Sequence, residues 1–431
     1  MACPVTISRS STSQMEEQFV AEDLGPLLVN RPRASLDAPN LYELRGVAQH
    51  YAWGRSAEES EVAKLMQAGG AVLDQTQRDL KWAELWIGTH ANGPASLKLP
   101  NGESVPLKDI LGCDLPFLLK VLSVNTALSI QSHPSKSLAE KLHRERPDIY
   151  KDPNHKPEMA IALSRFEALC GFRSVSELEC ALQEVPELAL CCGQEAVDRY
   201  ISVPEGNDTE KKRLLKALFT SLMTVDQMTA SDAVRKLVER LEAQAAVCEL
   251  TPREHLVLRL NAQYPLDIGV LSSYLLNYVC LNSGEAIALG ANEPHAYLSG
   301  EIVECMATSD NVIRAGLTPK FKDVNALCSS LTYKQGECTV MSGQEVEPGL
   351  RLYRPEFEEF EVWRMDLVEE QGNLSLPGTK GPVLSFCLSG KGTVNDIPVG
   401  KGTILFIPEG TPVRVRGDVV MWAASENGKG W

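Results

Sequence analysis

A regular alternation of apolar and polar residues begins at Thr126 and ends at Pro134. A period of two residues predicts a half-buried β-strand, and proline is typical of a strand end. Because residues two apart on a strand point to the same face, Ser129, Gln131 and His133 are expected to project together. Such a row fits either a polar face in water or a pocket in which the imidazole and the carboxamide oxygen bind a metal.

Two apolar stretches nearby each contain one charged side chain. Residues 115–124 predict a buried strand with Lys120 inside it. A lysine in such a strand lies at its end, extends to solvent, or is held in a pocket by an anion, and the nearby polar row favours the pocket. Glu158 opens a second buried strand over residues 158–163, where a carboxylate is costly unless it is paired, protonated or metal-bound.

Helical periodicity replaces the strand pattern over residues 174–273. Two capping boxes predict helix starts there, one formed by Ser174 with Glu177 and the other by Thr251 with Glu254. Leucine and valine recur at helical spacing between them. We therefore predict an all-α segment, and it carries no group of side chains suited to catalysis or metal binding.

Two shorter helices are expected earlier in the chain, over residues 60–66 and 137–146. Ser137 is the expected N-cap of the second, because Glu140 follows three residues later. Both helices lie between stretches that have the strand pattern, so this part of the chain is predicted to be mainly β.

The strand pattern resumes after the helical segment and brings several charged groups together. His295, Glu304, Asp310 and Arg314 fall within a stretch of twenty residues. Residues 341–431 consist of short strands separated by Gly and Pro turns, which predicts a sandwich or jelly roll. That last part contains no histidine and is expected to be structural.

These patterns predict a mainly β protein with an α-helical insertion. We expect an N-terminal arm over residues 1–40 and a discontinuous β domain over 41–173 and 274–340. The helical domain, 174–273, lies between the two parts, and a second β domain follows at 341–431. The arm contains acidic residues, which transit peptides avoid, so a flexible or loosely docked arm is expected.

Composition narrows the class of protein. With 44% hydrophobic and 23% charged residues, the 431-residue chain resembles soluble globular proteins. No apolar run reaches the roughly 18 residues of a membrane helix. A net charge of -15 argues against a nucleic-acid surface, although local lysines and arginines could still bind a small anion. The 12 cysteines form no C-x-x-C pair, so free thiols and a cytoplasmic location are expected.

Four side chains from the two parts of the first β domain would suit a metal ion. They are Gln131, His133, Glu158 and His295. Two imidazoles, a carboxylate and a carboxamide favour a first-row divalent cation, of which zinc is the commonest. With positions left for water or substrate, such a site would be catalytic. Spacing alone does not establish the site, because the residues are far apart in sequence.

Several motifs in these parts of the chain resemble the type I mannose-6-phosphate isomerases, also called phosphomannose isomerases, which are cupin enzymes. The matching stretches are residues 49–54, 83–90, 115–134, 154–163, 264–269 and 284–324. The resemblance covers nearly everything from Leu41 and is weakest in the helical segment and the C-terminal domain. It implies two cupin (jelly-roll) β domains with a helical domain inserted in the first.

The resemblance also implies a metal, a substrate and a catalytic residue. One zinc ion per chain would be held by Gln131, His133, Glu158 and His295, and Arg314 would be the catalytic arginine. The reaction would interconvert mannose 6-phosphate and fructose 6-phosphate through an enediol or enediolate, a step that feeds GDP-mannose synthesis and mannose metabolism. A monomer is expected, with a small sugar phosphate as its ligand.

Other roles within the matching motifs are more open. Glu304 and Lys156 are the candidates for the base that moves a proton between C1 and C2, with Glu304 ranked ahead. Glu304 could equally orient a metal ligand or Arg314. His155 is a candidate either for proton transfer or for a purely positional role.

The substrate phosphate requires cations and hydroxyls. Ser129, Lys120 and Lys156 resemble the family's phosphate-side residues, and Lys320 is a further candidate. Tyr297 and Asp310 are expected to line the pocket. These assignments follow from the resemblance.

One position departs from the family pattern. Ala57 stands where the family usually has glycine. If that position has a positive φ, alanine would cost about 1 kcal/mol.

Two other classes of protein remain alternatives. One is an oxygenase-type cupin with iron on the same ligands, which a pocket rich in lysine and arginine disfavours. The other is a sugar-phosphate-binding or storage protein on a cupin scaffold, which would be expected to lack the four ligands or Arg314, and all five are present.

Overall fold

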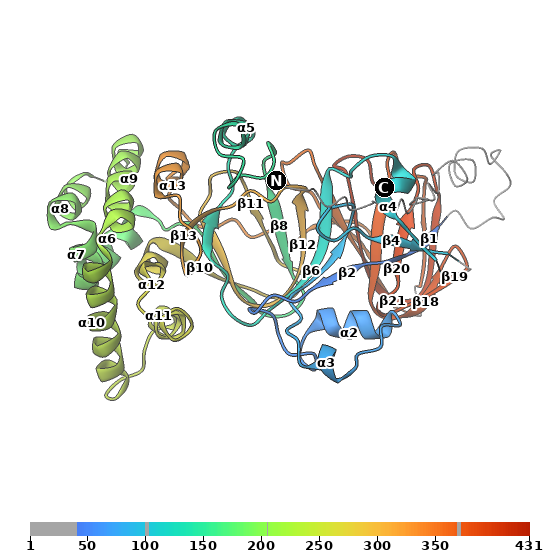
Figure 1. Cartoon of the computed structure of the whole chain (residues 1–431), viewed down its shortest axis with the longest axis horizontal. Coiled ribbons are helices and arrows are strands. Elements are labelled where there is room, and N and C mark those ends of the chain that lie inside the picture. The colour runs from blue at the N-terminus through green and yellow to red at the C-terminus, as the bar shows by residue number, and fades with distance from the viewer. Residues whose placement is uncertain (1–40, 100–102, 205, 369–371) are drawn as a thin grey trace, which may run out of the picture.

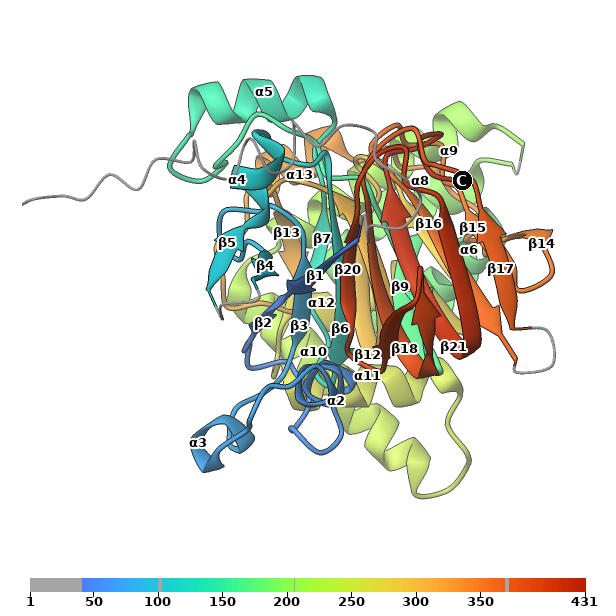
Figure 2. The same cartoon turned by 90° about the vertical axis from the view of Figure 1, so that its right-hand side faces the viewer.

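A helical domain and two antiparallel sheets follow one another along the long axis of the molecule (Figure 1). This computed structural model describes residues 41–99, 103–204, 206–368 and 372–431. The expected N-terminal arm, residues 1–40, lies outside the described residues. Figure 2 views the molecule from the end occupied by the C-terminal sheet.

The first sheet has 10 strands, and its longest strand, β12, joins its two halves. One end of β12 pairs with β7 and β9, and the other end lies between β6 and β8. The strands are β2 (Val47–Gln49), β3 (Glu84–Ile87), β6 (Phe117–Val124), β7 (Ile130–Ser132), β8 (Glu158–Ala162), β9 (Phe166–Phe172), β10 (Leu276–Leu281), β11 (Ala286–Leu289), β12 (His295–Ala307) and β13 (Ile313–Gly316).

The second sheet has 11 strands and combines both ends of the described chain. Tyr42 of β1 pairs with Phe406 of β20, so the N-terminal strand lies inside this sheet. Its strands are β1 (Tyr42–Arg45), β4 (Ser96–Lys98), β5 (Ser104–Pro106), β14 (Gln344–Glu347), β15 (Leu350–Tyr353), β16 (Glu361–Leu367), β17 (Asn373–Leu376), β18 (Val383–Val394), β19 (Ile397–Gly400), β20 (Ile404–Ile407) and β21 (Val413–Ser425). Strands β1, β4 and β5 come from the part of the chain expected in the first domain, so membership of a sheet does not follow the expected boundaries. The division into domains stays a prediction.

The helical domain lies at the end of the molecule opposite the second sheet (Figure 1). Both expected capping boxes are present, at Ser174 and at Thr251. The helices are α6 (Val175–Glu184), α7 (Pro186–Cys192), α8 (Gln194–Ser202), α9 (Asp208–Thr224), α10 (Gln227–Ala245), α11 (Pro252–Gln263) and α12 (Ile268–Ser272), followed by the 3₁₀ turn η2 (Ser273–Leu275). Their apolar faces share one core with the near end of the first sheet.

The remaining helices lie in connections: α2 (Glu61–Ala68), α3 (Gln75–Arg78), α4 (Leu107–Leu111), α5 (Lys136–Glu145) and α13 (Val324–Ser330). The N-cap of α5 is Ser135, so the expectation of Ser137 is wrong: the helix begins directly after Pro134 and the following serine. The strand expected from Thr126 is also shorter than predicted: β7 begins at Ile130, and before it Leu128 makes a single backbone hydrogen bond to Tyr297 of β12.

The core between the two sheets decides which side chains face the interior of the first sheet. In β6, Leu119 and Val121 pack in that core, so Lys120 points the other way. The same alternation turns Glu158 of β8 and Glu304 of β12 to the interior, since their strand neighbours also belong to the shared core. Lys120, Glu158 and Glu304 therefore face the same interior of the first sheet.

Two smaller expectations can be compared with the structure. Ala57 is buried and is not among the residues with positive φ, so alanine is accommodated there without strain. Within the described residues, no helix is long and apolar enough to cross a membrane.

Candidate active site

Three buried side chains meet inside the first sheet. His133 follows β7, while Glu158 and His295 open β8 and β12. One ligand atom from each lies within 4.8 Å of the other two. Nε2 of His295 is 2.9 Å from Oε1 of Glu158, and Nε2 of His133 is 3.4 Å from Oε2. The structure thus brings together three of the four expected metal ligands.

Hydrogen bonds to backbone carbonyls orient both imidazoles. Nδ1 of His133 donates to the carbonyl of Asn311 over 2.8 Å, and Nδ1 of His295 donates to that of Glu293 over 3.0 Å. Since a carbonyl only accepts, each Nδ1 carries the proton and each Nε2 presents its lone pair. Both Nε2 atoms are buried without a hydrogen-bond partner and face a carboxylate. Two lone pairs and a carboxylate repel one another unless a cation lies between them, so the group fits a divalent metal.

The electrostatics favour the protonation states that bind metal. Burial lowers the pKa of His133 to about 4, so its imidazole is neutral near pH 7. Burial alone would raise the pKa of Glu158, but its polar surroundings, the cationic Lys156 among them, lower it well below its usual range. A neutral imidazole and a charged carboxylate are the forms in which these groups ligate metals.

Strand register places Gln131 and Arg314 beside these ligands. Gln131 lies directly opposite His295 of β12 on one side and Arg314 of β13 on the other. Directly opposed residues of antiparallel strands project to the same face, so one row of side chains crosses three strands. The Ser129 hydroxyl donates to the Gln131 carboxamide oxygen over 3.4 Å, at the edge of this row.

Arg314 lies half-buried with no protein counter-ion. Among the described residues, no carboxylate or hydrogen-bond acceptor is in range of its guanidinium, and burial lowers its pKa. A partly desolvated cation without a partner is costly, so the position suits an anionic ligand or a negative charge that develops during a reaction.

Lys120 occupies a second row on the same interior face. It lies opposite Trp86 of β3 and Glu304 of β12. Its Nζ is 3.0 Å from Glu304 and 3.3 Å from Glu84, and all three charged groups are buried. Burial alone would lower the pKa of Lys120, but the two carboxylates raise it, and burial raises the pKa of Glu304. Two carboxylates already share this ammonium, and its expected contact with a substrate phosphate stays a prediction.

Two further candidates, Lys156 and Tyr297, contact Glu158. Nζ of Lys156 is 3.8 Å from Oε2 of Glu158, and the Tyr297 hydroxyl donates to Oε1 of Glu158 over 3.3 Å. Tyr297 therefore touches a metal-ligand candidate as well as lining the interior. His155 is paired through Nε2 with Glu359, which lies in the second sheet's part of the chain between β15 and β16.

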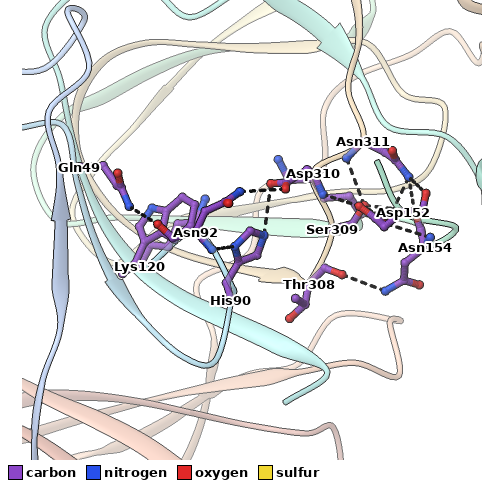
Figure 3. A network of polar contacts seen from close by, with 12 residues as sticks. Gln49, His90, Asn92, Lys120, Asp152, Asn154, Thr308, Ser309, Asp310 and Asn311 are labelled. Carbon is purple, nitrogen blue, oxygen red and sulfur yellow. Dashed lines mark hydrogen bonds and ion pairs between the residues drawn. The ribbon is translucent and has the colours of Figure 1, made fainter. Parts of the chain in front are cut away.

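The two remaining candidates lie farther out. Asp310 is partly exposed, and its carboxylate contacts Nε2 of His90 at 3.2 Å and Nδ2 of Asn92 at 3.1 Å (Figure 3). The hydrogen bond from His90 lowers the pKa of Asp310. Lys320 is exposed, and no contact joins it to the other site residues within the described chain.

Sequence patterns did not single out Glu84, Trp86, Asp152 or Asn311. Glu84 and Trp86 belong to a four-residue strand whose members are all buried, so no alternation marks them. Asp152 and Asn311 lie in turns, where aspartate and asparagine are common, and only the folded chain brings the two turns together (Figure 3).

Comparison with known proteins identifies the family. The family models of the phosphomannose isomerase type I catalytic domain and helical insertion domain match residues 41–175 and 192–276. Mannose-6-phosphate isomerase 2 of Arabidopsis thaliana is 42% identical over 88% of this chain and 91% of its own length. Mannose-6-phosphate isomerase of Homo sapiens is 39% identical over 86% of this chain and 94% of its own.

Solved structures agree with this assignment. A crystal structure of mannose 6-phosphate isomerase with zinc bound has a TM-score of 0.76 and 29% identity, and the match covers 90% of this chain and 100% of that one. A phosphomannose isomerase variant from Salmonella typhimurium has a TM-score of 0.77 with the same coverage. The expected fold, mainly β with a helical insertion, is therefore confirmed, and the resemblance found in the sequence is confirmed with it. The chain belongs to the type I phosphomannose isomerase family.

Proposed function

We propose that this protein is a zinc-dependent isomerase that interconverts mannose 6-phosphate and fructose 6-phosphate. The observation that carries the proposal is the buried group of His133, Glu158 and His295, whose two unpartnered Nε2 atoms face a carboxylate. Relatives about 40% identical over most of the chain are mannose-6-phosphate isomerases, which supports the choice of substrate.

The metal would be held by His133, Glu158 and His295, with the carboxamide oxygen of Gln131 as the fourth protein ligand. When bound, zinc supplies Lewis acidity that polarises the substrate oxygens at C1 and C2. The hydroxyl of Tyr297 helps to orient Glu158, because it donates to Oε1.

Arg314 would stabilise the negative charge of the enediolate. Its guanidinium lacks a protein counter-ion and shares a face with Gln131, so it can donate hydrogen bonds to a substrate anion. This makes it the catalytic arginine of the proposal.

Glu304 is our first candidate for the base that takes a proton from C2 of the aldose and returns it to C1. Burial raises its pKa, which brings a carboxylate nearer to the value that suits a base at neutral pH. Lys156, within 3.8 Å of Glu158, remains the alternative. We assign Lys120 to the neutralisation of Glu84 and Glu304, because it pairs with both.

The phosphate would lie toward Ser129, Lys156 and the exposed Lys320. Asp310 would line the pocket wall, held by His90 and Asn92.

We also propose a monomer of 47.2 kDa, which light scattering can test. The cysteines that the structure describes are free thiols, which fits a cytoplasmic enzyme that feeds GDP-mannose synthesis and mannose metabolism.

A coupled assay with mannose 6-phosphate, run with and without a chelator, tests the proposal. Purified protein should hold about one zinc per chain. Chelation should abolish turnover because it removes the Lewis acid from the site, and added zinc should restore turnover. His133→Gln should lose zinc, whereas His255→Gln, at an exposed histidine of the helical domain, should keep zinc and activity.

Three outcomes would contradict the proposal. Full activity in metal-free protein would exclude a zinc mechanism. Iron with oxygen uptake would indicate an oxygenase. Tight binding of mannose 6-phosphate without turnover would indicate a binding protein.

A further inference from the structure

Two turns meet, one before β8 and one between β12 and β13 (Figure 3), and the second contacts the metal-ligand candidate His133. The first contains Asp152 and Asn154, and the second contains Ser309, Asp310 and Asn311. Each turn leads into a strand that carries site residues, since Glu158 follows the first turn and Arg314 follows the second. Contacts that join the two turns therefore influence the positions of both Glu158 and Arg314.

Asp152 is the centre of this junction. Its Oδ1 accepts hydrogen bonds from the Asn154 backbone N–H at 2.9 Å, the Ser309 hydroxyl at 2.8 Å and Nδ2 of Asn311 at 3.3 Å. Its Oδ2 accepts the backbone N–H of Asp310 at 2.9 Å. No lysine or arginine pairs with this carboxylate within the described residues, so these donors are what stabilise its charge.

The second turn is tied down at further points. Nδ2 of Asn311 also donates to the backbone carbonyls of Asp152 at 2.7 Å and Asn154 at 2.9 Å. The Asn311 backbone N–H donates to the Ser309 hydroxyl at 3.1 Å. The main chain of Asn311 is thereby held in one orientation.

That main chain carries the acceptor for a metal-ligand candidate. The Asn311 carbonyl accepts Nδ1–H of His133 at 2.8 Å, which selects the tautomer and turns Nε2 toward Glu158. The path from Asp152 to Nε2 thus consists of a hydrogen bond to Asn311, that residue itself, a second hydrogen bond to His133 and the imidazole ring.

We propose that Asp152 is a positioning residue for His133, acting through the carbonyl of Asn311. The inference rests on the proposed zinc site, because the effect of Asp152 is on the zinc affinity of that site. Partners that orient a ligating histidine typically contribute ten- to a hundredfold to metal affinity. In this arrangement Asp152 contacts neither the metal nor the substrate. Its effect is on the direction of the Nε2 lone pair of His133.

The test compares Asp152→Asn, Asn311→Ala and the double variant by competition for zinc with a chromophoric chelator. Asparagine at 152 places an amide donor against the Asp310 N–H, and alanine at 311 removes the side-chain ties but keeps the carbonyl. Each single variant should weaken zinc binding about ten- to a hundredfold. Because both act on the same carbonyl, the double variant should lose less than the product of the two.

A matched control separates positioning from general stability. Asp226→Ala removes a carboxylate that caps α10 in the helical domain, where it accepts from the Thr229 N–H and hydroxyl. Alanine cannot cap the helix, so this variant should lower Tm without changing the dissociation constant for zinc. An unchanged zinc affinity in Asp152→Asn, or an equal loss of zinc affinity in Asp226→Ala, overturns the inference. Wild-type protein that binds no zinc would overturn the proposed function and this inference together, whereas the first two outcomes leave the proposed function intact.

Discussion

At the scale of single residues, Arg314 offers the sharpest separation of chemistry from structure. Arg314→Ala should keep zinc and lower kcat by about a hundred- to a thousandfold, because it removes a preorganised donor to a developing anion and no protein contact. Steady-state kinetics and metal content measure the two effects. Arg165→Ala, at an exposed arginine away from the site, should match the wild type. Loss of zinc in proportion to activity would make Arg314 a structural residue.

Lys120 tests the interior charges of the first sheet. Lys120→Met leaves Glu84 and Glu304 buried without their cation, which should lower the free energy of unfolding by about 3–5 kcal/mol. Urea unfolding measures this loss in the free energy of unfolding. Lys98→Met breaks a pair between partly exposed side chains, Lys98 and Glu43, and should cost at most about 1 kcal/mol. Equal losses in the two variants would show that the buried cluster needs no cation.

How far the sequence predicts the site differs from residue to residue. His133, Glu158 and His295 could be proposed as partners because they are ligand-type side chains in motifs that resemble the family, and the structure brings them together. The pairing of Lys120 with Glu84 could not, because it depends on the register between β3 and β6. Side-chain type is local information, whereas cross-strand register is not.

At the scale of elements, helices were easier to predict than short strands. Both capping boxes of the helical domain could be identified because their signals lie within four residues of one another. The strand expected from Thr126 was too long, because β7 pairs with its neighbours over only three residues and the residues before it form no ladder. A period of two shows which side chains share a face but cannot show where a partner strand ends.

The outer face of β12 should show a pH-dependent stability. Glu301 lies there opposite Ser123, which donates to its carboxylate, and Arg55 Nε is 3.4 Å away. Burial raises the pKa of Glu301 from 4.5 to about 7. The protonated form is therefore favoured by folding, and its contribution is complete below pH 4.5 and lost as pH rises through about 7.

Glu301→Gln measures this contribution, because glutamine stays neutral. Between these two pH values, the wild type should lose about 3 kcal/mol of unfolding free energy relative to the variant. Urea unfolding at several pH values provides the comparison, with Glu43→Gln at an exposed position as control. Parallel stability curves for wild type and Glu301→Gln would contradict the prediction.

At the scale of the whole molecule, the second sheet supports the site without supplying its metal ligands. Its apolar face packs against the outer face of β6, β8 and β12, and this contact turns Lys120, Glu158 and Glu304 inward. Glu359 reaches from its part of the chain to His155. The fold class, mainly β with a helical insertion, could be predicted from the change between strand and helix periodicity together with the family resemblance. The exchange of β1, β4 and β5 into the second sheet could not, because those pairings join residues from opposite ends of the chain.

That exchange has a consequence for synthesis on the ribosome. Strand β1 is made early, but its partner β20 is among the last elements to emerge. Until then one edge of β1 stays open to any other strand, and the surface that the second sheet covers on β6, β8 and β12 stays exposed. A nascent or truncated chain that stops before β20 therefore contains all the proposed metal ligands, but the strands around them lack the packing of the second sheet. Such a chain is expected to bind chaperones.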